Sequence, residues 1–178
     1  MNICEIIKSD IANGIGIRLS VFVSGCTNHC EGCFQPQTWD FNYGTTFTPE
    51  VENDIISELT KPQYDGITIL GGEPFEFINQ ESIRPLIERI RRELPEKTIW
   101  IYTGCVYERD LLPGKRRYSS DTDYILNNID ILVDGPFELN NKDIRLTFKG
   151  SSNQRVIDMI QTRTKGYVVL SEYNDKHR

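Results

Sequence analysis

The chain carries two kinds of hydrophobic pattern, which predict two kinds of element. Short apolar runs rich in β-branched and aromatic residues, each followed by a turn residue, predict strands over residues 17–23, 67–70, 98–102, 129–133 and 167–170. Apolar residues three and four positions apart predict amphipathic helices. We expect helices from Pro49 with Thr48 as N-cap, around residues 83–94, over 124–128, and after an N-cap at Ser152.

The order of these elements predicts the fold class. Strands alternate with helices, which is typical of an α/β fold with a mostly parallel sheet. The 178 residues are too few for a full eight-stranded barrel of roughly 250 residues, so we expect a partial, open (β/α) barrel. No repeat divides the chain, and we expect a single domain over residues 1–178. Residues 113–123 are expected to form a polar loop. The part after about residue 154 is an extension of unknown role, with a polar tail over 171–178.

Charge and composition exclude several classes of protein. The chain has 20 Lys and Arg against 26 Asp and Glu, a formal net charge of -6. This argues against general nucleic-acid binding, which needs a basic surface. No apolar run approaches the roughly 18 residues of a membrane span. Residues 1–5 lack the basic and then apolar order of a signal peptide. We therefore expect a soluble cytoplasmic protein with neither a nucleic-acid nor a membrane partner.

The five cysteines point to bound metal. Their number is odd and three of them, Cys26, Cys30 and Cys33, lie within eight positions, unlike a secreted disulfide scaffold. The spacing C-x3-C-x2-C supplies three thiolates for a cubane [4Fe–4S] cluster and leaves its fourth iron open to a ligand. Cys4 and Cys105 lie apart from this triplet, and small hydrophobic roles suit them better.

Two other interpretations of the triplet remain open. Structural zinc takes four Cys or His ligands, and His29 could be the fourth, although its position beside Cys30 would strain the loop. Three unligated core cysteines are the other alternative, which the polarity of the loop disfavours.

Further candidate residues lie at the predicted strand ends, where parallel sheets bind ligands. Gly71 and Gly72 would let backbone carbonyls approach a cationic ligand, and Glu73 could add a charge-assisted hydrogen bond. A plain turn is the alternative explanation for the glycines. Thr103 and Asp134 end two later strands, and Asp134 equally suits a turn before Gly-Pro.

Together these motifs resemble the radical S-adenosylmethionine (SAM) superfamily, in which C-x3-C-x2-C follows the first strand and a Gly-Gly-Glu-Pro segment follows later. Within that superfamily the chain resembles the branch of activating proteins of anaerobic ribonucleoside-triphosphate reductases. The matching stretches are residues 22–26, 32–34, 38–39, 71–74, 100–104, 132–135 and 150–154. Gly32 replaces the aromatic residue that most superfamily members have there, as is usual in this branch. The resemblance implies an open barrel of the radical SAM type.

The resemblance also implies roles for particular residues. Cys26, Cys30 and Cys33 would bind the [4Fe–4S] cluster, and SAM would chelate its open iron. Contacts to SAM are then expected from Gly32, Cys33 and Phe34, with the Phe34 ring against adenine. Amino-group contacts are expected from Gly71, Gly72 and Glu73, whereas Thr103 and Asp134 would bind ribose hydroxyls or a cation. No catalytic side chain is implied beyond the cluster and SAM.

The implied activity is that of a radical SAM oxidoreductase. The reduced cluster would cleave SAM, and the 5′-deoxyadenosyl radical would generate a glycyl radical on an anaerobic (class III) ribonucleoside-triphosphate reductase. Reduced flavodoxin or a similar protein would donate the electron, and residues 115–117 are either its basic docking patch or a solvated loop. The alternatives are a radical SAM enzyme acting on a small molecule or on a different glycyl-radical enzyme, and a non-enzymatic zinc or electron-transfer module.

Overall fold

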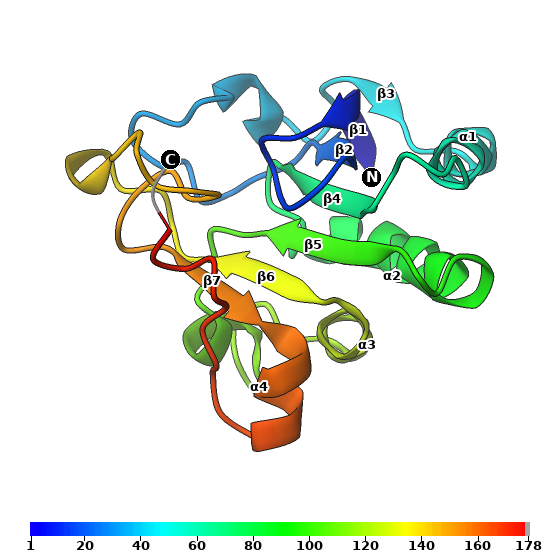
Figure 1. Cartoon of the computed structure of the whole chain (residues 1–178). Helices are drawn as coiled ribbons and strands as arrows, with labels where there is room; N and C mark the ends of the chain where they lie inside the picture. The colour runs from blue at the N-terminus through cyan, green and yellow to red at the C-terminus, as the bar shows by residue number, and fades with distance from the viewer. Residues whose placement is uncertain (177–178) are drawn as a thin grey trace.

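The structure is a computed structural model and describes residues 1–176. One seven-stranded sheet runs through it in the order β3-β1-β2-β4-β5-β6-β7 (Figure 1). The strands are β1 (Asn2–Asp10), β2 (Arg18–Val23), β3 (Thr45–Thr46), β4 (Gly66–Gly71), β5 (Thr98–Tyr102), β6 (Ile131–Asp134) and β7 (Arg155–Asp158).

The described residues form four α-helices: α1 (Pro49–Leu59), α2 (Phe77–Glu93) and α3 (Ser120–Asn128) lie between strands, and α4 (Met159–Lys165) follows β7. Thr48 caps α1 as expected, because its hydroxyl accepts the Val51 N–H. Short helical turns occupy Pro36–Trp39, Tyr107–Leu111 and Leu139–Asn141. Within residues 1–176, no helix has the combined length and apolar character needed to cross a bilayer.

The sheet confirms the α/β class and corrects the expected strand directions. Strands β2, β4, β5 and β6 are parallel, as the alternating pattern predicts. However, β1 and β3 on one side and β7 on the other are antiparallel to their neighbours. The sheet is therefore mixed rather than mostly parallel, and it is not closed into a barrel.

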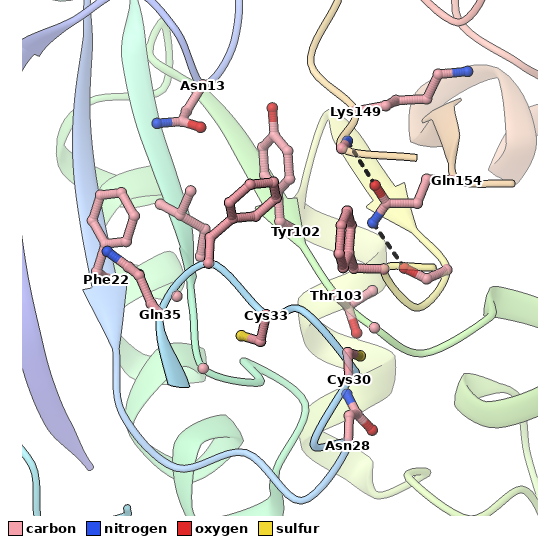
Figure 2. Close-up of a pocket in the computed structure, with 18 of the residues that line it drawn as sticks. Asn13, Phe22, Asn28, Cys30, Cys33, Gln35, Tyr102, Thr103, Lys149 and Gln154 are labelled. Carbon is pink, nitrogen blue, oxygen red and sulfur yellow. Dashed lines mark hydrogen bonds between the residues drawn. The ribbon is translucent and has the colours of Figure 1, made fainter. Parts of the chain in front are cut away.

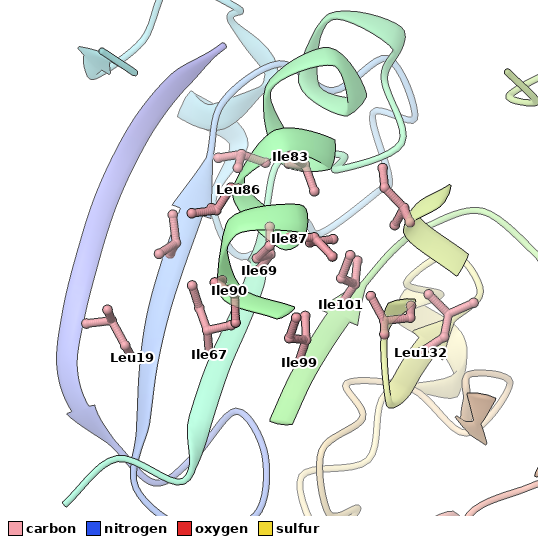
Figure 3. Close-up of a cluster of buried hydrophobic side chains, with 14 of the residues drawn as sticks. Leu19, Ile67, Ile69, Ile83, Leu86, Ile87, Ile90, Ile99, Ile101 and Leu132 are labelled. Carbon is pink, nitrogen blue, oxygen red and sulfur yellow. The ribbon is translucent and has the colours of Figure 1, made fainter. Parts of the chain in front are cut away.

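The main core lies between the sheet and α2, as Figure 3 shows. The apolar side of α2 buries Ile83, Leu86, Ile87 and Ile90 against residues of the parallel strands. On the opposite face of the sheet, a second apolar cluster comprises Trp100, Ile131, Val133, Phe148 and Val156.

Arg18 is a buried cation on this second face. Its guanidinium donates to Thr68 Oγ1 at 2.6 Å and to the Ile67 carbonyl at 2.6 Å, and it lies 5.2 Å from the centre of the Trp100 ring. It also donates to the Ile15 carbonyl, and therefore holds the 11–17 loop against the sheet. Burial lowers the pKa of Arg18 to about 10, which leaves the group charged at neutral pH.

The prediction of a helix that begins after Ser152 is wrong. Val156 and Ile157 belong to β7, which pairs with β6, and α4 begins only at Met159. Both side chains are fully buried, one in each apolar cluster, because β7 is covered on both faces. A short apolar run of this kind does not distinguish a two-sided strand from a buried helical segment.

Other differences lie at the ends of the chain and in one loop. The run 167–170 is not a strand, because only Leu170 forms an isolated bridge, to Ile157. α3 begins at Ser120, inside the expected 113–123 loop, where Ser119 and Thr122 form a capping box. Strands β1 and β3 were not expected. The predicted polar tail is described only as far as Lys176.

Leu86 tests the packing of α2 on the sheet. It is 1% exposed, so Leu86→Ala is expected to lower the free energy of unfolding by about 2–5 kcal/mol through lost burial and a residual cavity. Chemical denaturation of the cluster-free protein measures this. Arg92→Ala, at an exposed position of the same helix, should change it by less than about 0.5 kcal/mol. Equal effects of the two substitutions would contradict this packing.

Candidate iron-sulfur site

The loop that carries Cys26, Cys30 and Cys33, here called the cysteine loop, leaves the sheet at the end of β2. Backbone hydrogen bonds hold it in place. The Gly25 N–H donates to the Thr38 carbonyl at 2.8 Å, and the Cys26 N–H to the Trp39 carbonyl at 3.3 Å. Cys26 is buried, whereas Cys30 and Cys33 are partly exposed. The loop therefore encloses Cys26 and leaves Cys30 and Cys33 partly accessible.

A cavity of about 590 Å³ lies beside this loop, at the carboxyl ends of the parallel strands. Figure 2 shows Cys30, Cys33 and Thr103 toward one end of it, and Asn13 and Lys149 toward the other. Its volume is within the range of pockets that hold a small organic ligand. Parallel strands thus bring separate motifs to one site, as the sequence predicts.

The three thiols fit a cubane cluster by their chemistry. Each cysteine of such a cluster binds a different iron, so the thiols need not converge on one point. Burial raises the pKa of Cys26 to about 11 and also raises that of Cys30, so both release a proton when they bind iron. In the described part of the chain, no three His, Cys, Asp or Glu side chains are grouped to hold a single metal ion. The His29 ring is stacked on Trp39 at 4.5 Å, and the structure does not gather it with the cysteines.

Gly71 and Gly72 form part of the cavity wall, where their backbone packs closely on β2 and the cysteine loop. The Gly72 N–H donates to the Val23 carbonyl at 2.7 Å. A Cβ atom at Gly72 would lie 2.7 Å from the Gly25 carbonyl oxygen, and Gly71 has a φ of 108°. Close backbone packing therefore requires glycine at both positions. Without side chains, the backbone of Gly71 and Gly72 is open to the cavity.

Glu73 lies outside the cavity wall and is fully buried. Its carboxylate accepts hydrogen bonds from Thr103 Oγ1 at 2.6 Å, Asn28 Nδ2 at 2.7 Å, and the N–H groups of Phe75 and Gly104 at 2.9 Å each. Burial raises the pKa of this carboxyl, although these four donors oppose the effect. Glu73 thus connects the cysteine loop to the ends of β4 and β5, and is placed to position the site rather than to contact a ligand.

The other expected site residues divide between the cavity wall and its surroundings. Thr103 is on the wall, and so is Phe34, which is 65% exposed with its ring 5.0 Å from that of Phe137. Asp134 is buried away from the cavity, ion-paired with Arg155 at 2.5 Å. Gly32 and Cys26 are also absent from the wall.

Several cavity residues are not among the site residues expected from the sequence, although two of them fall within the matching or cysteine-bearing stretches. Asn28 lies on the wall and has a signal, since it falls between the first two cysteines. Tyr102 ends a strand, which is also a signal. Asn13 and Lys149 reach the wall from loops that are distant in sequence, and no sequence signal marks either residue as part of the site. Their placement follows from tertiary structure alone.

The basic run 115–117 is solvated only in part. Lys115 and Arg116 are exposed, and Arg116 pairs with the buried Asp110 at 2.8 Å. Arg117 is buried and pairs with Glu76. The solvated-loop interpretation therefore fits Lys115 and Arg116 but is wrong for Arg117, whose charge is compensated inside the molecule and does not add to a docking patch.

Comparison with known proteins defines the class to which this fold and site belong. The family model for a 4Fe-4S single cluster domain matches residues 12–157, which include the whole cysteine loop and the cavity. The chain is thus a single-cluster 4Fe-4S domain protein.

Curated relatives narrow the assignment. Over 158 residues the chain is 40% identical to the anaerobic ribonucleoside-triphosphate reductase-activating protein of Escherichia coli K12, covering 88% of this chain and 97% of the relative. The protein of that name from Haemophilus influenzae is 38% identical over 156 residues, covering 86% and 96%. The one from Enterobacteria phage T4 is 35% identical over 156 residues, covering 88% and 93%. The chain belongs to the family of anaerobic ribonucleoside-triphosphate reductase-activating proteins.

The raised pKa of Glu73 makes stability depend on pH. The folded chain retains a proton that the unfolded chain releases above the ordinary pKa of 4.5. Relative to Glu73→Gln, the wild type is therefore most stable below pH 4.5 and loses stability as pH rises above it, by at most about 1.4 kcal/mol per pH unit. Denaturant unfolding of the cluster-free proteins at several pH values measures this. Glu81→Gln, at an exposed position of α2, controls for the loss of a carboxylate. Parallel pH profiles for wild type and Glu73→Gln would contradict the expectation.

Proposed function

We propose that this protein is a radical SAM activase that generates a glycyl radical on an anaerobic ribonucleoside-triphosphate reductase. The observation that carries the proposal is the cavity that joins Cys30 and Cys33 to the Gly71–Gly72 backbone. The match to a 4Fe-4S domain and the relatives' role as activating proteins of anaerobic ribonucleoside-triphosphate reductases support it. On this proposal the open sheet is a partial barrel of the radical SAM type.

Cys26, Cys30 and Cys33 would hold the [4Fe–4S] cluster. Bound there and reduced, the cluster would supply the one electron needed to cleave SAM to methionine and a 5′-deoxyadenosyl radical, the species that would abstract a hydrogen atom from the partner's glycine. The backbone of Gly71 and Gly72 would accept hydrogen bonds from the amino group of SAM. The exposed ring of Phe34, on the cavity wall, would cover adenine, and Thr103 would orient the nucleoside from the end of β5.

The remaining cavity wall would exclude water and admit the second reactant. Phe22, Leu70 and Phe148 give it apolar surface, which protects a radical from solvent. Reduced flavodoxin or a similar protein remains the proposed electron donor. A cytoplasmic location is part of the proposal, because a reducing compartment keeps the cluster cysteines as free thiols.

Cleavage of SAM tests this activity directly. Anaerobically reconstituted protein with dithionite and SAM is expected to release 5′-deoxyadenosine, measured by liquid chromatography. Cys30→Ala should abolish release because a cluster thiolate is lost. The matched control is Cys4→Ala, since Cys4 lies on β1 outside the cysteine loop, and it should retain release. An active Cys30→Ala variant, or a wild type that binds zinc and releases nothing, would overturn the proposal.

The partner is tested separately. Adding a class III reductase to the same reaction should produce a glycyl-radical doublet in the EPR spectrum, dependent on SAM and absent with Cys30→Ala. Deoxyadenosine without a radical on the reductase would favour the alternative, a radical SAM enzyme acting on a small molecule or on a different glycyl-radical enzyme.

A further inference from the structure

A buried ion pair lies directly beneath the first turn of the cysteine loop. Glu76, the N-cap residue of α2, pairs with Arg117, which comes from the segment before α3. Both residues are buried, and they lie 41 positions apart in sequence. The remaining side-chain hydrogen bonds of the pair go to Thr27, the residue next to Cys26.

Thr27 binds both members of the pair. Its N–H and its hydroxyl donate to Glu76 Oε1 at 2.9 Å and 2.7 Å. The same hydroxyl accepts from Arg117 Nη2 at 2.5 Å. Glu76 and Arg117 thus fix the backbone and the side chain of the first residue between Cys26 and Cys30.

The next residue of the turn is fixed in a similar way. Asn28 donates to Glu73 at 2.7 Å, so two successive residues of the turn are bound by two carboxylates that lie three positions apart. The two carboxylates differ in charge compensation. Glu76 has Arg117 as a partner, whereas the four donors to the Glu73 carboxylate are neutral: Asn28, Thr103 and the N–H groups of Phe75 and Gly104.

Stability alone does not account for the pair. A buried ion pair repays its desolvation only when the remaining donors are also satisfied, and a well-packed apolar pair is often as stable. In the described structure Arg117 Nε is buried without a hydrogen-bond partner. What the pair does provide is a fixed position for Thr27, together with a cation that cancels the charge of Glu76.

We propose that Glu76 and Arg117 are positioning residues for the iron–sulfur cluster, an inference that rests on the proposed function. Their hydrogen bonds to Thr27 set the backbone path from Cys26 to Cys30, and hence the placement of two of the three thiolates. Arg117 also removes a negative charge that would otherwise lie beside the cluster. Outer groups that orient metal ligands typically change metal affinity by about 10–100-fold when they are removed.

Thr27→Val tests the positioning directly. Valine has nearly the same shape but lacks the hydroxyl that both partners bind, so the reconstituted variant is expected to lose iron to a chelator about tenfold faster than wild type. In the cluster-free protein, amide hydrogen exchange over residues 26–30 should also become faster. Thr27→Ser keeps the hydroxyl and should restore both properties.

Thr164→Val is the matched control. Thr164 is also exposed, and its hydroxyl donates to the Ile160 carbonyl at 2.9 Å, but it lies in α4 away from the cysteine loop. This variant should match wild type in iron retention and in exchange over residues 26–30. Melting temperatures of all variants separate loop effects from general loss of stability.

Arg117→Met and the double variant Glu76→Gln/Arg117→Met test the charge. The single variant leaves Glu76 uncompensated, so the cluster's reduction potential, measured by redox titration with EPR, should shift to a more negative value. The double variant removes both charges, and the amide introduced by Glu76→Gln still offers an oxygen to Thr27. The reduction potential of its cluster should therefore return toward that of wild type. Equal potentials in the two variants would overturn the charge role.

The outcomes separate this inference from the proposed function. If wild type binds no iron–sulfur cluster, the proposed function fails and the inference with it. If wild type binds the cluster and Thr27→Val retains iron and exchange protection as wild type does, positioning through Thr27 is wrong while the proposed function stands.

Discussion

The arrangement of the site depends on one enclosed carboxylate, that of Glu73. Transferring an unpartnered carboxylate into a protein interior is strongly unfavourable, so its donors must stay in place. Those donors come from the cysteine loop, from the end of β5 and from the turn that leads into α2. A displacement of any one segment would leave the carboxylate short of a partner. The enclosed carboxyl group therefore makes the three segments behave as one unit.

The antiparallel strands at both sides of the sheet complete this unit. Because β1 runs opposite to β2, it begins where β2 ends, and the Asn2 carbonyl accepts the Ser24 N–H at 2.9 Å. Because β7 runs opposite to β6, Arg155 starts β7 beside Asp134 and pairs with it. The segments that follow the parallel strands β2 and β6 are thus held by the first residues of the antiparallel strands β1 and β7. The mixed sheet is thus a means of fixing the edge at which the cavity lies.

Sequence patterns predicted those features of the structure that neighbouring residues determine. The strand 98–102 and the cap at Thr48 follow from short-range rules. The meeting of Cys30 and Cys33 with Gly71 and Gly72 follows from the general rule that the carboxyl ends of parallel strands share one edge of a sheet. The misassigned part, residues 152–158, depends on burial from both faces, which the sequence does not record. The roles of Glu73 and Arg117 were missed for a related reason. Apart from Phe75 beside Glu73, the partners of these two side chains lie 30 to 90 positions away in the chain. Charge alone therefore suggested a ligand contact for Glu73 and a solvated or docking loop for Arg117.

The close approach at Gly72 has a consequence for inherited variation. A Cβ at this position would meet the carbonyl of Gly25, which belongs to the backbone and cannot rotate away as a flexible side chain can. Every missense change at this codon therefore meets the same obstruction, whatever the character of the new side chain. Around Gly114 and Gly166, by contrast, nothing lies within 4 Å of an added Cβ, and only their positive φ of 79° and 74° disfavours a side chain. Glycines of one chain thus differ in what opposes their substitution, and Gly72 is one of those at which a neighbouring backbone opposes it.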